Sequence, residues 1–189
     1  MNKLIKISLI GSNYSGKTNI INKYINNSYK IFQPTVGVDF LKKIEKINNE
    51  DIKIFLWDTC GDFKLYDIIK LYIKNINIIL YVFDLNNIES FNNCIKWINI
   101  IKINNSSNAN NIQNYLIGAK SDLEHKVDSI QINEICKKYN LKYYSCSSKE
   151  NNNILEMFKE IIIKQMENNN YIDQLSLNKK NTIRCYSCF

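Results

Sequence analysis

Residues 11–18 constrain the fold more than any other part of the chain. They read Gly-Ser-Asn-Tyr-Ser-Gly-Lys-Thr, a glycine-rich loop that ends in Lys-Thr. The loop follows an apolar-rich segment at 3–10, which predicts a strand, and leads into 18–26, where apolar residues recur at helical spacing. Such a loop wraps backbone N–H groups around a phosphate and needs glycine where φ is positive. The sequence therefore predicts a strand, a phosphate-binding loop and a helix, in that order.

Two side chains of this loop carry charge and metal chemistry. Lys17 supplies a positive charge to the outer phosphates, and the Thr18 hydroxyl can bind Mg²⁺. The other predicted phosphate contacts in the loop are Asn13, Tyr14, Ser15 and Gly16.

Strand-like and helix-like segments alternate along the rest of the chain. Further strands are predicted at 78–83, 115–118 and 141–146. Apolar residues three and four apart predict helices at 88–103, 129–139 and 151–166. Two alternating segments at 40–47 and 51–57, with Asn-Asn-Glu between them, predict an antiparallel hairpin. This order predicts an α/β fold.

Size and composition exclude several classes of protein. The 189 residues, 45% of them hydrophobic and 23% charged, are typical of one globular domain. The longest clean apolar run, at 78–83, is far shorter than the roughly 18 residues of a membrane-spanning helix. The N-terminus has no secretory signal pattern, so we expect an intracellular protein with reduced cysteines. The net charge of +7 comes from dispersed lysines, with Arg184 the only arginine, so we expect no nucleic-acid binding.

Three more motifs follow predicted strands. Asp58 directly follows the strand-like run at 51–57 and can hold Mg²⁺ near the phosphates. The alternative is an aspartate that only caps the end of a strand. Ala-Lys-Ser-Asp at 119–122 and Ser-Ser-Lys at 147–149 follow the last two strands. Open α/β sheets bind ligands at the carboxyl ends of their strands, so we expect all these motifs at one site.

Over residues 3 to about 167 the chain resembles a Rab-type small GTPase of the Ras superfamily. The resemblance rests on the order and spacing of the phosphate loop, Pro-Thr-Val-Gly-Val-Asp-Phe at 34–40, Trp-Asp-Thr-Cys-Gly at 57–61 and the motifs at 120–122 and 147–149. It implies a P-loop NTPase fold, or G domain, over residues 1–167. This fold has a six-stranded, mostly parallel sheet with helices on both faces. The implied ligands are GTP or GDP with Mg²⁺.

The same resemblance implies roles at the phosphate end of the site. Thr35, in the first switch, would join Thr18 and Asp58 at Mg²⁺. Gly61, in the second switch, would donate its N–H to the γ-phosphate.

Other matching residues imply contacts with the guanine base. Asp122 would bind the N1 and N2 edge of guanine, and Lys120 would pack along the base. Tyr29 matches the aromatic residue that stacks on guanine. The remaining base-end residues are Ser147, Ser148 and Lys149.

Two departures from the family bear on hydrolysis and on base recognition. Asp62 stands where the family has a glutamine that orients the attacking water. A carboxylate cannot donate a hydrogen bond and is repelled by the γ-phosphate, so we expect slow hydrolysis from a catalytic set of Asp62, Lys17 and Gly61. Ala119 replaces the Asn or Thr that usually precedes the base-reading lysine, which predicts weaker nucleotide binding. Neutral drift in an AT-biased coding sequence is the alternative explanation.

The C-terminal segment carries a membrane prediction. Residues 168–189 lose the helical period and predict a flexible tail that ends Cys-Tyr-Ser-Cys-Phe. Rab tails usually carry two terminal cysteines for prenylation, so lipidation of Cys185 and Cys188 is favoured over an unmodified tail. We therefore expect a peripheral protein on the cytosolic face of an intracellular membrane. The implied partners are exchange factors, activating proteins, effectors and a prenyl chaperone of the Rab kind.

These observations favour a GTP/GDP switch of the Rab type in vesicle traffic, with slow intrinsic hydrolysis. A degenerate scaffold that binds nucleotide with negligible GTPase activity is the first alternative, motivated by Asp62 and Ala119. A P-loop kinase is the second, but the chain lacks the arginine-rich lid that such an enzyme needs.

Overall fold

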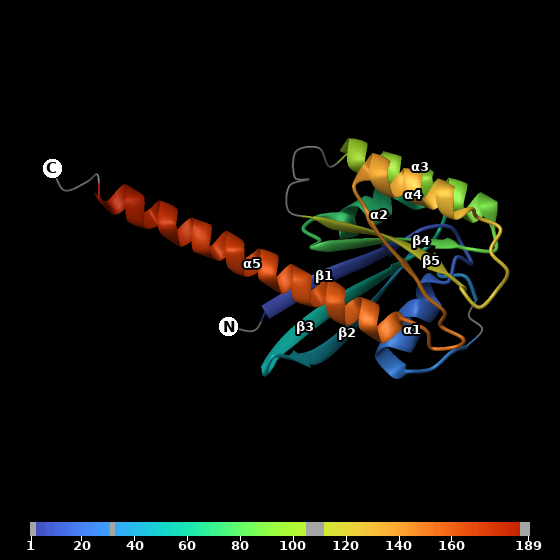
Figure 1. The fold of residues 1–189 in the computed structure, drawn as a ribbon, viewed down its shortest axis with the longest axis horizontal. Helices are drawn as coiled ribbons and strands as arrows, with labels where there is room; N and C mark the ends of the chain where they lie inside the picture. The colour runs from blue at the N-terminus through green and yellow to red at the C-terminus, as the bar shows by residue number, and fades with distance from the viewer. Residues whose placement is uncertain (1–2, 31–32, 105–111, 186–189) are drawn as a thin grey trace.

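The computed structural model describes residues 3–30, 33–104 and 112–185. Strands and helices alternate along the chain, as Figure 1 shows. The elements are β1 (Lys3–Ile10), α1 (Lys17–Asn26), β2 (Val38–Ile47), β3 (Glu50–Thr59), the 3₁₀ helix η1 (Phe63–Leu65), α2 (Tyr66–Ile73), β4 (Ile78–Asp84), α3 (Ile88–Asn104), β5 (Gln113–Ala119), α4 (Ser129–Tyr139), β6 (Lys142–Ser145) and α5 (Ile154–Cys185). The predicted α/β fold is confirmed.

The strands form one six-stranded sheet in the order β2-β3-β1-β4-β5-β6. β1 pairs in parallel with β3 and β4, and β5 pairs in parallel with β4 and β6. β2 lies at one edge and runs antiparallel to β3. The predicted six-stranded, mostly parallel sheet is confirmed. Because β1, β3, β4, β5 and β6 are parallel, the residues that follow them meet at the carboxyl ends of the strands.

The β2–β3 hairpin turns on two asparagines. Ile47 pairs with Glu50, which leaves Asn48 and Asn49 as the turn. Their φ angles are 52° and 63°. Two-residue hairpin turns with positive φ at both central positions match the twist of the strands, and asparagine tolerates this conformation well.

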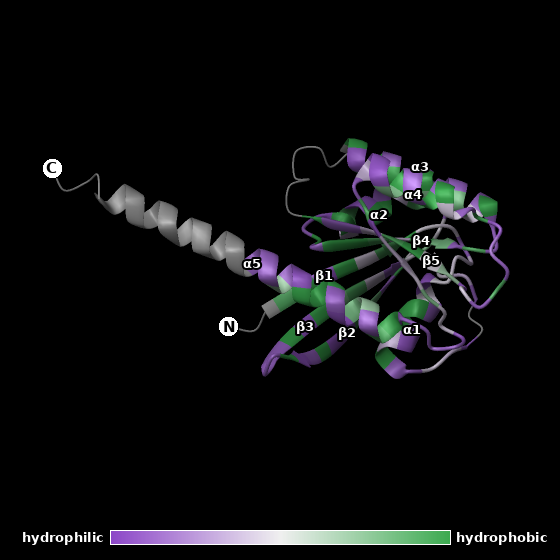
Figure 2. Ribbon diagram, in the orientation of Figure 1, coloured by the Kyte–Doolittle hydropathy of each residue, from purple (hydrophilic) through white to green (hydrophobic). Residues whose placement is uncertain are grey.

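Helices cover both faces of the sheet (Figures 1 and 2). On one face, α1 and α5 pack together through the stacked rings of Tyr24 and Phe158, whose centroids are 3.8 Å apart. On the other face, α2, α3 and α4 bury Ile69, Trp97 and Ile132. β4 lies between these layers and is buried at every position, as its apolar sequence requires.

Two helical regions differ from the sequence prediction. The prediction has no element between residues 58 and 78, where the structure has η1 and α2. α2 is short, and its buried residues are only Ile69 and Ile73, so the apolar period is too brief to stand out. The predicted end of the last helix, at residue 166, is wrong because α5 continues to Cys185. Residues 167–185 contain neither Gly nor Pro, so no helix breaker stops it.

The flexibility of residues 168–189 stays a prediction. None of the helices in the described part of the chain is long and apolar enough to cross a membrane.

Candidate functional site

The phosphate loop lies at the carboxyl end of β1 and leads into α1. Gly11 has φ 155°, and a Cβ there would lie 2.0 Å from the carbonyl oxygen of Val82 in β4. Gly16 adopts φ 104° and is the N-cap of α1. Only glycine tolerates both the close approach to Val82 at residue 11 and the positive φ at residue 16. The loop can therefore pack closely over the ends of the strands. The N–H groups at the start of α1 are thereby placed where they can bind an anion.

Lys17 reaches back across the loop. Its Nζ donates to the carbonyl oxygens of Gly11 at 2.9 Å and Ser12 at 2.7 Å. Burial lowers the pKa of Lys17 to about 8, against the opposing effect of the Asp58 carboxylate. The hydroxyl oxygens of Ser12 and Ser15 are also buried, with no hydrogen-bond partner. Unpartnered buried hydroxyls are uncommon, so this loop is suited to receive a polar, negatively charged ligand.

Three oxygen-bearing side chains meet beside the loop. Thr18 Oγ1 donates to Asp58 Oδ2 at 2.6 Å, and Thr35 Oγ1 donates to the same oxygen at 3.1 Å. The two threonine hydroxyl oxygens lie 3.1 Å apart. Burial raises the pKa of Asp58, whereas the bond from Thr18 and the charge of Lys17 act to lower it.

Asp58 is nearly inaccessible, and its second oxygen, Oδ1, has no hydrogen-bond partner. An unpartnered buried carboxylate oxygen next to two hydroxyls is the kind of oxygen-donor set that Mg²⁺ prefers. Thr18, Thr35 and Asp58 therefore fit the Mg²⁺ ion that the sequence motifs predict at this position.

The base end of the site lies after β5 and β6. Asp122 Oδ1 accepts a hydrogen bond from Ser147 Oγ at 2.6 Å. Ser147 Oγ in turn accepts from the N–H of Glu150 at 3.1 Å. Ser148 is buried and Lys149 is exposed in the same loop. The two motifs that were predicted to cooperate are therefore hydrogen-bonded to each other, which fixes the Asp122 carboxylate.

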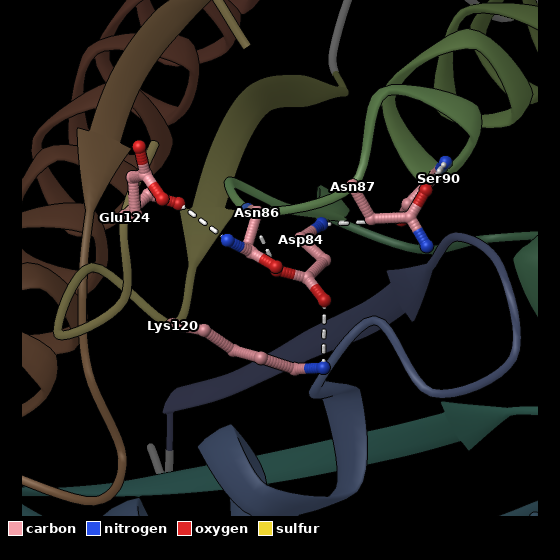
Figure 3. A network of polar contacts seen from close by, with 6 residues as sticks. All are labelled: Asp84, Asn86, Asn87, Ser90, Lys120 and Glu124. Atoms are coloured by element: carbon pink, nitrogen blue, oxygen red, sulfur yellow. Dashed lines mark hydrogen bonds and ion pairs between the residues drawn. The ribbon is translucent and has the colours of Figure 1, made fainter. Parts of the chain in front are cut away.

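Lys120 is held by Asp84, an acidic residue that no sequence motif predicts. Its Nζ forms an ion pair with Asp84 Oδ2 at 2.7 Å, as Figure 3 shows. Asp84 also accepts from the Asn86 N–H through Oδ1 and donates its own N–H to Ser90 Oγ. One sequence feature could have indicated a role for Asp84. It is an acidic residue at the end of an otherwise apolar strand, and the other motifs also follow strand ends. Asp84 orients the lysine across the site.

Ala119 lies against the phosphate loop. Its Cβ would be 3.3 Å from a Cβ built on Gly16, and its side chain is buried. A methyl group fills this position and offers no hydrogen bond to the loop. The weaker nucleotide binding expected from Ala119 stays a prediction.

A cavity of about 230 Å³ joins the phosphate loop to the first switch. The predicted residues that line it are Asn13, Tyr14, Gly16, Lys17, Thr18, Tyr29, Thr35 and Lys120. A larger cavity of about 750 Å³ lies at the amino ends of β4, β5 and β6, away from the predicted site. None of the motif residues lines it. The predicted site residues therefore gather around the smaller cavity.

The second switch begins with a close contact to the loop. Gly61 donates its N–H to Asn13 Oδ1 at 2.8 Å. A Cβ on Gly61 would lie 1.9 Å from the Asn13 nitrogen. Gly61 is thus pressed onto the phosphate loop as only glycine can be, and its N–H is already hydrogen-bonded within the protein.

The residues after Gly61 are also fixed. Asp62 is exposed, and its Oδ1 accepts the N–H of Lys64 at 2.9 Å, which caps η1. Phe63 stacks on Trp97 of α3, with ring centroids 4.5 Å apart. No sequence pattern predicts a role for Phe63, because its partner Trp97 lies far away in the chain. The start of the second switch is anchored to the body of the fold.

Comparison with known proteins agrees with this geometry. Residues 6–168 match the family described as "Ras family". The chain belongs to the Ras family. It is 35% identical over 170 residues to the Ras-related protein RabT1 of Dictyostelium discoideum, covering 87% of this chain and 75% of that protein. It is 29% identical over 196 aligned positions to the Ras-related protein Rab-13 of Bos taurus, covering 96% of this chain and 95% of that protein.

Membership of the Ras family, with Rab relatives, confirms the predicted Rab-type small GTPase. Ras-family proteins bind guanine nucleotides, generally with Mg²⁺, and act as GTPase switches, so these general properties hold for this chain. The contacts of single residues with the nucleotide stay predictions. Cys188 lies outside the described residues, and the side chain of Cys185 is not among those described.

Proposed function

We propose that this Ras-family protein is a Rab-type switch in intracellular vesicle traffic whose own GTP hydrolysis is slow. In this proposal Lys17 and the N–H groups of the loop bind the phosphates, while Thr18, Thr35 and Asp58 hold Mg²⁺. Mg²⁺ would neutralise charge on the phosphate oxygens. Asp122 pairs with guanine, and Tyr29 and Lys120 flank the base, with Ser147, Ser148 and Lys149 closing that end.

The geometry of Asp62 is the observation that supports slow hydrolysis. Its carboxylate accepts the Lys64 N–H and caps η1. An ionised carboxylate only accepts hydrogen bonds, so it cannot both receive and donate as a water-orienting amide does. It also adds negative charge near the γ-phosphate, which the like charge of that phosphate disfavours.

An exposed apolar patch supports effector binding at the switches. It consists of Val36, Phe40 and Ile44, which are 92%, 51% and 64% exposed, together with the half-buried Phe55 and Trp57. The Phe40 ring packs against those of Phe55 and Trp57, with centroids 5.1 Å and 5.3 Å away. Clustered exposed aromatic side chains are typical of protein-binding surfaces. The patch begins next to Thr35, so a partner docked on it would be sensitive to how nucleotide orders the first switch.

The proposal includes attachment to the cytosolic face of an intracellular membrane. Lipidation at Cys185 and Cys188 would supply it, since one lipid chain alone binds a bilayer only marginally and two bind stably. Exchange factors, activating proteins and a prenyl chaperone complete the proposed partners, by similarity to the Rab relatives.

Single-turnover GTP hydrolysis tests the proposal directly. Asp62→Gln restores an amide that can orient water, so we expect hydrolysis roughly tenfold faster than in the wild-type protein. Asp67→Asn is the matched control, because Asp67 lies in the first turn of α2 and should leave the rate unchanged. Equal rates for wild type and Asp62→Gln would contradict the assignment. GTP binding with no detectable phosphate release in the wild-type protein would instead support the scaffold alternative.

A further inference from the structure

Asn13 separates two cavities. On one side lies the 230 Å³ cavity that contains Lys17 and Thr35. On the other side lies a cavity of about 310 Å³, lined by the second switch and the start of α3, which includes Gly61 and Asn93. Asn13 lines both cavities. Its hydrogen bond to Gly61 joins the phosphate loop to the second switch across this boundary.

The Gly61 N–H cannot move far from this position. The Gly61 backbone is packed against Asn13 and Ser12, with no room for a Cβ. Two residues further on, Phe63 is stacked on the fully buried Trp97. Because the backbone is held on both sides, the Gly61 N–H faces the end of the phosphate loop.

One N–H group therefore faces two competing acceptors. The amide oxygen of Asn13 already accepts its hydrogen bond at 2.8 Å. A terminal phosphate bound by Lys17 in the adjoining cavity needs donors from the switches, because γ-phosphate contacts are what order them. To reach Gly61, that phosphate must displace the Asn13 amide. GDP has no such phosphate and leaves the bond intact.

We propose that Asn13 acts as an internal substitute for the terminal phosphate and so makes the protein favour GDP over GTP. This inference rests on the proposed nucleotide switch and adds the residue that sets its resting preference. The free and GDP-bound proteins both retain the Asn13–Gly61 bond, so this bond makes no net contribution to GDP affinity. Only GTP binding must break it. A net hydrogen bond of this kind corresponds to about a fivefold change in an equilibrium constant.

The test compares Asn13→Ala with the wild-type protein in binding fluorescent GDP and a non-hydrolysable GTP analogue. We expect the variant to bind the GTP analogue about fivefold more tightly and GDP within about twofold of wild type. Asn93→Ala is the matched control. Asn93 lines the same second cavity, but its amide oxygen accepts from Lys96 and not from Gly61, so the affinity ratio should not change.

A second measurement reads the bond itself. In the GDP-bound proteins, hydrogen exchange of the Gly61 amide should be at least fivefold faster in Asn13→Ala than in wild type and unchanged in Asn93→Ala. An unchanged affinity ratio, or equal Gly61 exchange, overturns the role of Asn13 while nucleotide binding stands. Failure of the wild-type protein to bind either nucleotide overturns the proposed switch instead.

Discussion

Lys17 makes nucleotide affinity depend on pH above neutrality. In the free protein its pKa is about 8, against an ordinary value of 10.5, because the side chain is buried. Bound phosphates favour the charged ammonium, so binding raises this pKa and takes up a proton. At pH 8.5 about three quarters of Lys17 is neutral in the free protein, so each bound GDP takes up about 0.75 proton. At pH 7 the uptake is about 0.1 proton, and GDP affinity falls about tenfold between pH 7 and pH 9.

The same pKa shift affects the stability of the nucleotide-free protein. The folded-state pKa of about 8 lies below the unfolded-state value of 10.5, so between these pH values the unfolded chain binds the extra proton. Stability therefore rises with pH across this window, by up to about 3 kcal/mol. Below about pH 8 both states are protonated, and burial of the charge destabilises the free protein.

Isothermal titration calorimetry in buffers of different ionisation enthalpy measures the proton uptake. Lys17→Met is the comparison, because it removes the titrating group while keeping an unbranched side chain. Its affinity should be lower at every pH, but its proton uptake should not rise between pH 7 and pH 8.5. An uptake below about 0.2 proton for wild type at pH 8.5, or the same rise in Lys17→Met, would refute the reasoning.

Three further changes have definite expected outcomes. Tyr14 adopts φ 61°, so Tyr14→Gly should raise the free energy of unfolding of the GDP-bound protein in urea by about 1 kcal/mol, whereas Asn140→Gly, at φ 50°, should change it little. Asp122→Asn should shift the competition against labelled GDP from GTP toward XTP, and equal competition by ATP in wild type would contradict guanine recognition. Cys185→Ser combined with Cys188→Ser should move the protein from membranes to cytosol with nucleotide binding unchanged. An unmodified C-terminal peptide in intact-mass analysis of native protein would contradict lipidation.

The parts of the fold that the sequence predicts are those with local signals. β4 is apolar at nearly every position, and the asparagines between β2 and β3 mark a turn without any knowledge of tertiary contacts. The phosphate loop is predictable because its chemistry needs particular residues at fixed spacing. α2 escapes prediction because eight residues with two buried isoleucines, Ile69 and Ile73, give too short a pattern. The end of α5 is not predicted because the apolar period marks only the part of a helix that packs against the sheet. A helix can continue beyond that part, as α5 does.

The functional contacts that the sequence does not reveal join residues far apart in the chain. Asn13 and Gly61 are 48 positions apart, and Lys120 and Asp84 are 36 apart. Neither Asn13 nor Asp84 belongs to a pattern that names its partner. Only the meeting of strand ends at one sheet edge brings them together. The sequence therefore predicts the location of the site but not which of its polar groups form hydrogen bonds or ion pairs with one another.

The strand order leaves β2 and β6 as the two edges of the sheet. An edge strand offers unpaired N–H and C=O groups to any other extended chain. β2, the longer edge, carries Lys42, Lys43 and Lys46, and β6 has only four residues and starts with Lys142. Charged and short edges of this kind disfavour strand-to-strand association between copies. The lysines of the two edges thus protect an isoleucine-rich chain from aggregation, even with the exposed apolar patch on the face of the hairpin.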